Sequence, residues 1–390
     1  MSKQTNSTSR PLGESRPEPV DADLDVQWRR VVGRRSFLSG VGMAGAAAVG
    51  GSAILAGEAA AAGTRVTPGD VAILRLLAAI ELIESDLWQQ YNELGGVKGG
   101  NPAYMAALSN LDSDMPQYIA DNTDDELSHA AFLNAYLRSK GAQPVNLDEF
   151  RTLPSSRASG ARQIGRLTNL QSLDVDTSWY VRYRSTENPD LRAHFPQAVN
   201  IKGEPAIPLN DADTPPGLPA PVPPAGAQAT RMQAIANTAG FHFAYIEQGG
   251  SSLYSIMALK ATSLEVLRIV VSIGGVETNH FSLWHDKAGN AVADPLAGVK
   301  DPKTGTFFPN LNTSGSEATQ TNLILPEPCE FIPGLPKCSV VRPTLDAIAG
   351  AQAAVRGLSA DGLFNGQSPD FFRFIRRLAR EADEAVRGLR

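Results

Sequence analysis

The sequence contains only two cysteines, Cys329 and Cys338, among its 390 residues. With no further cysteine and no histidine between these two, a zinc site built on them is not expected. An even number of cysteines at close spacing in an exported chain predicts one local disulfide, Cys329 to Cys338. Two free thiols are the alternative.

The chain also lacks the patterns of several large functional classes. It has no glycine-rich nucleotide loop, no Rossmann fingerprint and no Ser-His-Asp arrangement. Its formal net charge is −6, and no basic stripe is interleaved with aromatic residues, so nucleic acid is not an expected partner. Hydrophobic residues make up 42%, which suffices for a sizeable core in one large domain or two ordinary ones.

The first 62 residues are not expected to belong to the fold. Residues 1–28 are polar and contain proline, which is typical of disorder. An uncharged run rich in glycine and alanine follows at 40–57, and the alanines at 59–62 offer a cleavage site. This order predicts a secretory signal peptide. The alternative is a membrane anchor, although the run is barely long enough to span a bilayer.

Paired arginines precede the apolar run and are followed by Phe37 and Leu38. Arg34, Arg35 and these two residues resemble a twin-arginine (Tat) motif. The resemblance implies the Tat export machinery as a partner and a periplasmic or extracellular location. It also implies transport of a chain that is already folded, often with its cofactor in place.

One short pattern occurs twice in the remaining sequence, as Glu126-Leu-Ser-His129 and as Glu277-Thr-Asn-His280. In a helix, residues three apart lie on one face, one turn from each other, so each pair can hold one metal ion. Two such pairs, each with a further glutamate from a neighbouring helix, make the two-metal carboxylate site of a four-helix bundle.

Four long helices are predicted around these residues. The first has Thr67 as its N-cap and Pro68 at its first position, and the second has Thr123 as its N-cap. One or two short helices are expected between them, within 101–121. The four long helices are expected at 68–94, 123–140, 228–260 and 262–286.

The first and third helices supply the two further glutamates, Glu81 and Glu247. We expect Glu126 and Glu277 to bridge two ions, with Glu81 and Glu247 terminal and one histidine, His129 or His280, on each ion. Glu84 is the alternative to Glu81. Glu81 is preferred because it matches the helical face better. Four carboxylates are neutralised by two divalent cations, which favours iron or manganese.

Other interpretations of these residues remain open. Glu126 can be the capping-box partner of Thr123, and the buried glutamates and histidines can form an ionic network without metal. His194, His242 and His285 are expected to be ordinary histidines, with a place behind the ligands as the alternative for His242. The glycine pairs 249–250 and 274–275 indicate close helix packing or room for a site.

Long loops interrupt and follow the predicted bundle. The insertion at 142–227 contains the proline-rich stretch 214–224 and is expected to pack against the bundle, with a role as a lid as one option. Residues 289–390 are loop-rich, with helices expected over 342–358 and 368–389. We expect these two helices to pack outside the bundle or against a second copy in a homo-oligomer.

From about residue 66 to 288 the chain resembles the ferritin-like domain proteins of a group that includes plant desiccation-related proteins and Tat-exported bacterial homologues. The group often has an aromatic residue after Glu84, where this chain has Ser85-Asp86, so the ligand on the first helix stays open. The stretches that carry the resemblance are Ile80–Trp88, Glu126–His129, Leu167–Arg184, Tyr245–Glu247 and Glu277–His280.

The resemblance implies an all-α, ferritin-like four-helix bundle with a di-metal centre. The first hypothesis for its function is redox chemistry with oxygen, peroxide or ferrous iron, catalase-like or ferroxidase-like. The second is a non-enzymatic stress protein of the cell envelope with a structural metal or none. A helical interaction module without metal is the third.

Overall fold

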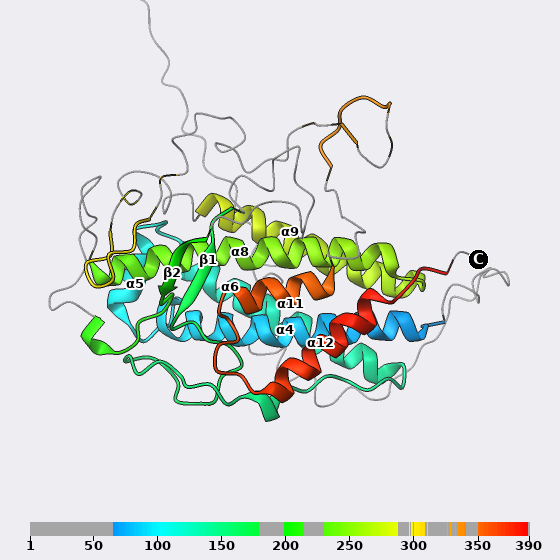
Figure 1. Ribbon diagram of the computed structural model, residues 1–390, viewed down its shortest axis with the longest axis horizontal. Helices are drawn as coiled ribbons and strands as arrows, with labels where there is room; N and C mark the ends of the chain where they lie inside the picture. Colours follow the sequence, from blue (N-terminus) through cyan, green and yellow to red (C-terminus); the bar gives the residue numbers. More distant parts are fainter. Residues whose placement is uncertain are drawn as a thin grey trace, which may run out of the picture. The chain divides into compact units, whose positions relative to one another are not determined.

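The computed structural model describes residues 65–178, 199–213, 230–287 and 350–388, together with short stretches between 296 and 340 (Figure 1). The predicted signal, with Arg34 and Arg35, and the proline-rich stretch 214–224 lie outside the described residues. Among the helices that are described, none combines the length and apolar character that crossing a membrane requires.

Four long helices form the bundle and bury one continuous apolar core. The helix α4 packs along α6, and α8 packs along α9; Figure 1 shows the two pairs running lengthwise beside each other. This arrangement confirms the predicted all-α fold. The bounds are Pro68–Gly95 for α4, Met115–Ser139 for α6, Arg231–Lys260 for α8 and Leu264–Lys287 for α9.

The first bundle helix begins as its sequence predicts. The Thr67 hydroxyl accepts from the backbone N–H of Asp70 at 3.1 Å, and the Asp70 carboxylate accepts from the backbone N–H of Thr67 at 2.9 Å. This reciprocal capping box satisfies two donors that the helix itself leaves unpaired. Pro68 occupies the first position, where its missing N–H costs nothing.

The predicted start of the second helix at Thr123 is wrong. The helix α6 begins at Met115, and Pro116 in its first turn marks this earlier start. Thr123 lies about two turns inside the helix, and its hydroxyl is 2.7 Å from the carbonyl oxygen of Ile119. Glu126 is therefore not a capping-box residue, and its buried position needs another explanation.

The insertion contains elements that the sequence analysis did not predict. Two strands, β1 (Leu173–Asp176) and β2 (Val199–Glu204), pair antiparallel with Val175 opposite Ile201. Both of these side chains are fully buried, and β1 packs against α8. The shorter elements of the loops are α5 (Pro102–Ser109) and the 3₁₀ turns η1 (Asp148–Phe150) and η2 (Asp211–Asp213).

A buried carboxylate on α4, Asp86, holds the insertion against the bundle. Its Oδ2 accepts from the backbone N–H groups of Leu167 and Thr168, both at 2.9 Å, and its Oδ1 lies 2.7 Å from a guanidinium nitrogen of Arg151. One helical residue thus satisfies a run of insertion backbone that packing would otherwise leave unpaired.

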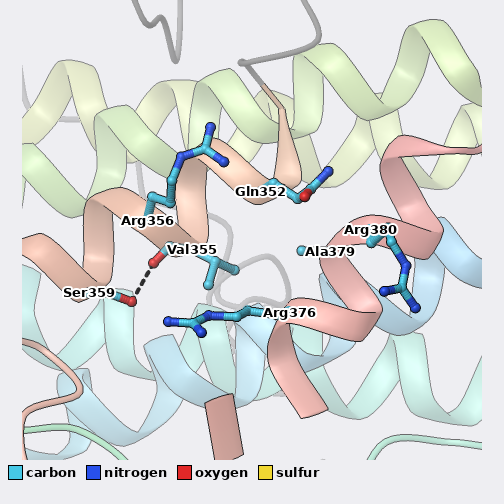
Figure 2. Close-up of a pocket in the computed structure, with 7 residues that line it drawn as sticks. All are labelled: Gln352, Val355, Arg356, Ser359, Arg376, Ala379 and Arg380. Carbon is cyan, nitrogen blue, oxygen red and sulfur yellow. Dashed lines mark hydrogen bonds between the residues drawn. The ribbon is translucent and has the colours of Figure 1, made fainter. Parts of the chain in front are cut away.

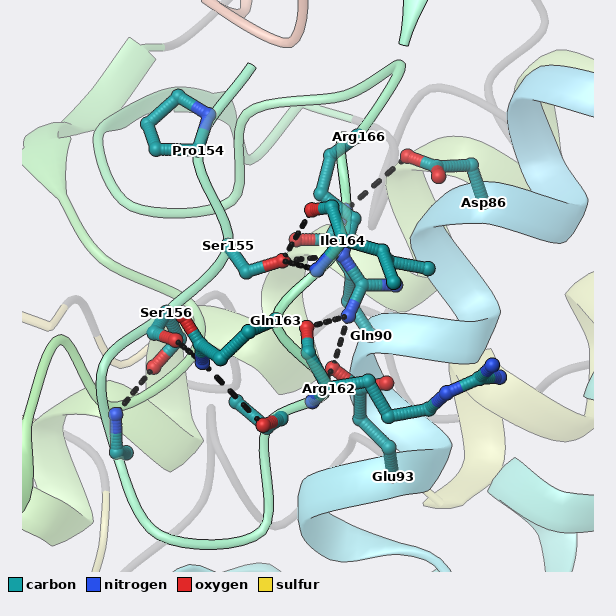
Figure 3. Close-up of polar contacts among 12 residues, drawn as sticks. Asp86, Gln90, Glu93, Pro154, Ser155, Ser156, Arg162, Gln163, Ile164 and Arg166 are labelled. Carbon is teal, nitrogen blue, oxygen red and sulfur yellow. Dashed lines mark hydrogen bonds and ion pairs between the residues drawn. The ribbon is translucent and has the colours of Figure 1, made fainter. Parts of the chain in front are cut away.

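A second tie lies two turns along the same helix, where Glu93 pairs with the almost fully buried guanidinium of Arg166. Figure 3 shows Asp86, Gln90 and Glu93 on α4 facing the segment around Arg166. The described part of the insertion therefore packs on α4, as the sequence analysis predicts. None of the contacts described for this part of the insertion places it over the centre of the bundle as a lid.

Two further helices, α11 (Ala351–Ala360) and α12 (Pro369–Asp383), pack outside the bundle, with α12 against α4 and α11. The helix α12 starts at the predicted Ser368 cap but ends before Leu389. Its last residue, Asp383, accepts from the backbone N–H groups of Ala351 and Gln352 at 2.8 and 3.0 Å, and so caps α11. Residues 341–349 lie outside the described part.

The outer face of these two helices is basic. Arg356 on α11 and Arg376 and Arg380 on α12 line a hollow of about 410 Å³ (Figure 2). The opposite face of α12 buries Phe371 and Ile375, so its apolar side is used inside the molecule. The helix is amphipathic because it covers the bundle and has a solvated outer side.

Cys329 and Cys338 are not joined to each other in the structure, and the disulfide between them stays a prediction. Cys338 is exposed, and its Sγ lies 3.8 Å from the carbonyl oxygen of the next residue, Ser339. A disulfide requires two Cβ atoms about 4 Å apart in a fixed orientation, which nearness in the sequence does not ensure.

Replacing Asp86 with asparagine should lower the free energy of unfolding by about 3 kcal/mol, because an amide group then faces the N–H donors and the guanidinium that the carboxylate satisfies. Asp148→Asn is the matched control, since Asp148 also lies near Arg151, at 3.4 Å, but is largely exposed. Denaturant unfolding of both variants measures the difference. Equal, small losses would show that Asp86 does not anchor the insertion.

Candidate metal centre

Seven ionisable side chains meet in the interior of the bundle, and each is at most 8% exposed. The helix α4 supplies two of them, α6 two, α8 one and α9 two, and all six residues of the preferred predicted set are among them. The one-turn spacing of the repeated pattern places each glutamate and its histidine on the same inward face. The seven are Glu81, Glu84, Glu126, His129, Glu247, Glu277 and His280.

The side chains form two groups, and in each the potential ligand atoms lie within 4.8 Å of one another. Two glutamates, Glu126 and Glu277, belong to both groups. Shared carboxylates of this kind can bridge two neighbouring cations. The first group is Glu81, Glu126, His129 and Glu277, and the second is Glu126, Glu247, Glu277 and His280.

Each group is centred on one imidazole nitrogen. The Nδ1 of His129 lies 3.3 Å from an oxygen of each of three glutamates, Glu81, Glu126 and Glu277. In the second group, the Nδ1 of His280 lies 3.1 Å from Glu126 and 3.3 Å from Glu247. The two histidines thus stand one in each group.

The two candidates on α4 occupy different places. Glu81 is a member of the first group and accepts a hydrogen bond from the hydroxyl of Tyr254. Glu84 is outside both groups and, like Glu277, lies close to Gly250. The structure therefore places Glu81 where the preferred interpretation has it, and adds Glu84 as a fifth buried carboxylate.

The crowding of carboxylates raises most of their pKa values. Burial is the largest cause, and the charge of Glu126 adds to it; together they raise the pKa of Glu81 to about 8. Burial, followed by neighbouring carboxylates, also raises the pKa values of Glu84 and Glu277 well above the usual range. The interior therefore favours protons, or another positive charge, on these groups.

The two imidazoles supply part of that positive charge. Burial alone would lower the pKa of His129, but hydrogen bonds to Glu126, Glu277 and Glu81 outweigh it and raise the pKa well above the usual range. The pKa of His280 is raised in the same way, chiefly by the charge of Glu247. Hydrogen bonds from both histidines overcome burial at Glu126 and lower its pKa.

Several buried atoms of the two groups nevertheless make no hydrogen bond of good geometry, although some of them lie 3.1–3.3 Å from an atom of an imidazole or carboxylate neighbour. They include both carboxylate oxygens of Glu277, one oxygen each of Glu81 and Glu247, and the Nδ1 of His280. Leaving a buried polar atom unpaired costs about 1–3 kcal/mol, so a cluster of such atoms needs an explanation. Carboxylate oxygens with imidazole nitrogens form a donor set that iron and manganese accept, so the residues fit a pair of such ions.

Sequence reasoning missed three residues that hold the ligand set in place. The amide of Asn122 donates to Glu126 at 2.9 Å and to Glu247 at 3.0 Å. Asp125 lies 3.1 Å from the Nε2 of His280, and Tyr254 donates to Glu81. Helical spacing offered a signal for two of them, because Asn122 precedes Glu126 by four residues and Tyr254 follows Glu247 by seven.

The fold and the site together define a four-helix bundle with a carboxylate and histidine centre. A family model described as a ferritin-like domain matches residues 69–290. The match covers more than half of the chain, and the chain belongs to this family. Comparisons with curated proteins and with solved structures gave no match. The narrower desiccation-related and Tat-exported group stays a prediction.

Gly250 makes room for the carboxylates, since a Cβ there would lie 2.5 Å from an oxygen of Glu277. Gly250→Ala should therefore lower the free energy of unfolding by about 1–3 kcal/mol, as overpacking does. Gly249→Ala is the matched control, because nothing lies within 4 Å of its added Cβ. It should gain up to about 1 kcal/mol from helix propensity. Denaturant unfolding compares the two variants. Equal effects would show that Gly250 is not needed to make room for the carboxylates.

Proposed function

We propose that this chain is an exported di-metal carboxylate protein that uses iron or manganese for redox chemistry with peroxide or oxygen, or for the oxidation of ferrous iron. The observation that carries the proposal is the pair of buried ligand groups that share Glu126 and Glu277. Two cations held by these residues would supply redox chemistry with a small oxidant.

The residues of the chain have separate tasks in this proposal. Glu126 and Glu277 would be shared by the two ions, Glu81 and Glu247 would each bind one of them, and so would His129 and His280. Asp125 accepts from the Nε2 of His280, which keeps the Nδ1 of that ring free to bind.

Burial of the whole set keeps bulk water away and strengthens its electrostatic interactions. Asn122 donates to one oxygen each of Glu126 and Glu247, and Tyr254 donates to one oxygen of Glu81. These hydrogen bonds fix the carboxylate orientations, while the second oxygens of Glu81 and Glu247 each face an imidazole nitrogen at 3.3 Å. The site is thereby pre-organised to receive cations.

Export is part of the proposal and is supported by the N-terminal sequence. Arg34 and Arg35, followed by Phe37 and Leu38, resemble a Tat motif ahead of an apolar run. A route that carries folded proteins suits a chain whose centre is enclosed by four helices. Association into a homo-oligomer remains a prediction.

The alternative is a non-enzymatic stress protein of the envelope, with a structural metal or none. The raised pKa values of His129 and His280 favour this alternative, because two imidazolium groups offset part of the carboxylate charge without metal. Turnover with peroxide or ferrous iron separates the two functions. A loaded protein without turnover would favour the structural role.

Metal content is the direct test of the site. Elemental analysis of the purified protein after loading should find about two iron or manganese ions per chain. The double variant Glu126→Ala/Glu277→Ala should lose both ions, because each of these glutamates belongs to both groups. Glu265→Ala is the control, since Glu265 lies on α9 in an exposed pair with Lys140. Absence of metal from the wild type would refute the di-metal proposal.

Metal affinity should rise with pH. At neutral pH the metal-free protein holds protons on His129 and His280, and also on Glu81, which has a pKa of about 8. A metal ion must displace these protons when it binds. Affinity should therefore fall as the pH drops below about 8, with protons released on binding. Calorimetry in buffers of different ionisation enthalpy counts the released protons. Binding without proton release would contradict this protonation pattern.

A further inference from the structure

A continuous group of buried aromatic rings lies beside the candidate metal centre. Trp88 on α4 and Trp284 on α9 are stacked, with ring centroids 5.1 Å apart and an angle of 19° between the planes. The ring of Tyr91 lies one turn along α4, with its centroid 5.6 Å from that of Trp88. Phe243 packs against all three rings. All four side chains are fully buried.

One end of this group connects to the ligand set through a single side chain. The indole N–H of Trp284 donates to the side-chain oxygen of Asn122 at 2.7 Å. The amide of the same Asn122 donates to Glu126 and Glu247. A path of packed aromatic rings and hydrogen bonds therefore runs from two proposed ligands to Tyr91.

The other end of the path is a buried chain of three hydrogen-bonding groups. The Tyr91 hydroxyl lies 2.8 Å from the Nδ1 of His242, and the Nε2 of His242 lies 3.1 Å from a carboxylate oxygen of Asp361. A carboxylate accepts hydrogen bonds, so the Asp361 oxygen pairs with a proton on Nε2 and leaves Nδ1 to face the Tyr91 hydroxyl as its acceptor. Tyr91 therefore donates its hydroxyl proton toward a base.

A second buried tyrosine shows that this base is not needed merely to satisfy a hydroxyl. Tyr104 is also fully buried, and its hydroxyl donates to the backbone carbonyl oxygen of Ala206 at 2.6 Å. A carbonyl oxygen completes the hydrogen bond but does not take up the proton. Of these two tyrosines, Tyr91 is the one whose hydrogen-bond partner can take up the proton.

We propose that Tyr91 is a redox-active tyrosine that supplies one electron to the metal centre through Trp88 and Trp284, with His242 as the acceptor of its proton. The proposal rests on the proposed di-metal function. His242 and Asp361 are positioning and proton-accepting residues in it. Neither touches a proposed metal ligand among the described contacts.

The step balances as follows. Reduction of peroxide to two waters would consume two electrons and two protons, and of these two electrons the metal centre would supply one and the aromatic path the other. Tyr91 refills the path with one electron while its O–H bond breaks and the proton passes to the Nδ1 of His242. The products are a neutral phenoxyl radical and an imidazolium beside the Asp361 carboxylate.

Burial raises the pKa of the Tyr91 phenol well above its usual value, so the group is protonated at neutral pH. Its oxidation must therefore release a proton, and the buried site offers no bulk water to accept it. The position of His242 removes that obstacle.

The first experiment uses the metal-free protein, so that its result does not depend on metal binding. An ultraviolet laser pulse photoionises tryptophan, and transient absorption then follows tryptophanyl and tyrosyl radicals. Wild type and the matched control Tyr104→Phe should show a tyrosyl signal that grows as the tryptophanyl signal decays. Tyr91→Phe should lose most of that growth. His242→Gln should slow it at least about tenfold, because the base is lost.

The second experiment treats the metal-loaded protein with peroxide and records electron paramagnetic resonance spectra. A tyrosyl radical is expected in wild type and in Tyr104→Phe, and no such radical in Tyr91→Phe. Denaturant unfolding of each variant confirms that it is folded.

Equal tyrosyl signals in wild type and Tyr91→Phe without metal would overturn the proposal. Loss of the signal in Tyr254→Phe instead would assign the radical to the tyrosine that contacts Glu81. A metal-free signal that has no counterpart in the loaded protein would overturn the link to the centre. Failure of the di-metal function itself is seen separately, in the metal content.

Discussion

The accumulation of negative charge in the bundle interior is the constraint on which the rest of the structure depends. Five glutamates are buried there, and at an effective dielectric constant of 20 two unit charges 4 Å apart repel by about 4 kcal/mol. Burying them together requires protons or cations. The raised pKa values of Glu81, Glu84 and Glu277 express this requirement, and His129 and His280 meet part of it.

Two carboxylates on α4 show how surroundings separate a structural role from a chemical one. Asp86 is surrounded by backbone N–H donors and the guanidinium of Arg151, so its charge is fully used in holding the insertion. Glu84, two residues earlier, faces other carboxylates and has an unpaired oxygen. Both are buried, and only their partners distinguish them.

The sequence could predict contacts between residues that are close along one helix, but not contacts between distant segments. The clustering of the two glutamate–histidine pairs was predictable because helical periodicity places Glu126 with His129, and Glu277 with His280, on one face. The predicted helix start at Thr123 was wrong because threonine occurs inside helices as well as at N-caps, and the residue type alone does not distinguish the two positions. The pairing of Asp361 with His242 was not predictable, since no local spacing relates residues 119 positions apart.

His242 on α8 and His280 on α9 have the same kind of partner at Nε2 and different partners at Nδ1. Each has a carboxylate oxygen 3.1 Å from Nε2, Asp125 for His280 and Asp361 for His242. This carboxylate fixes the ring and directs Nδ1 inward. At His280 the Nδ1 meets the carboxylates of the centre, whereas at His242 it meets the phenol of Tyr91. One device thus orients a proposed metal ligand in one place and a proton acceptor in the other, and the stacked tryptophans lie on the path between them.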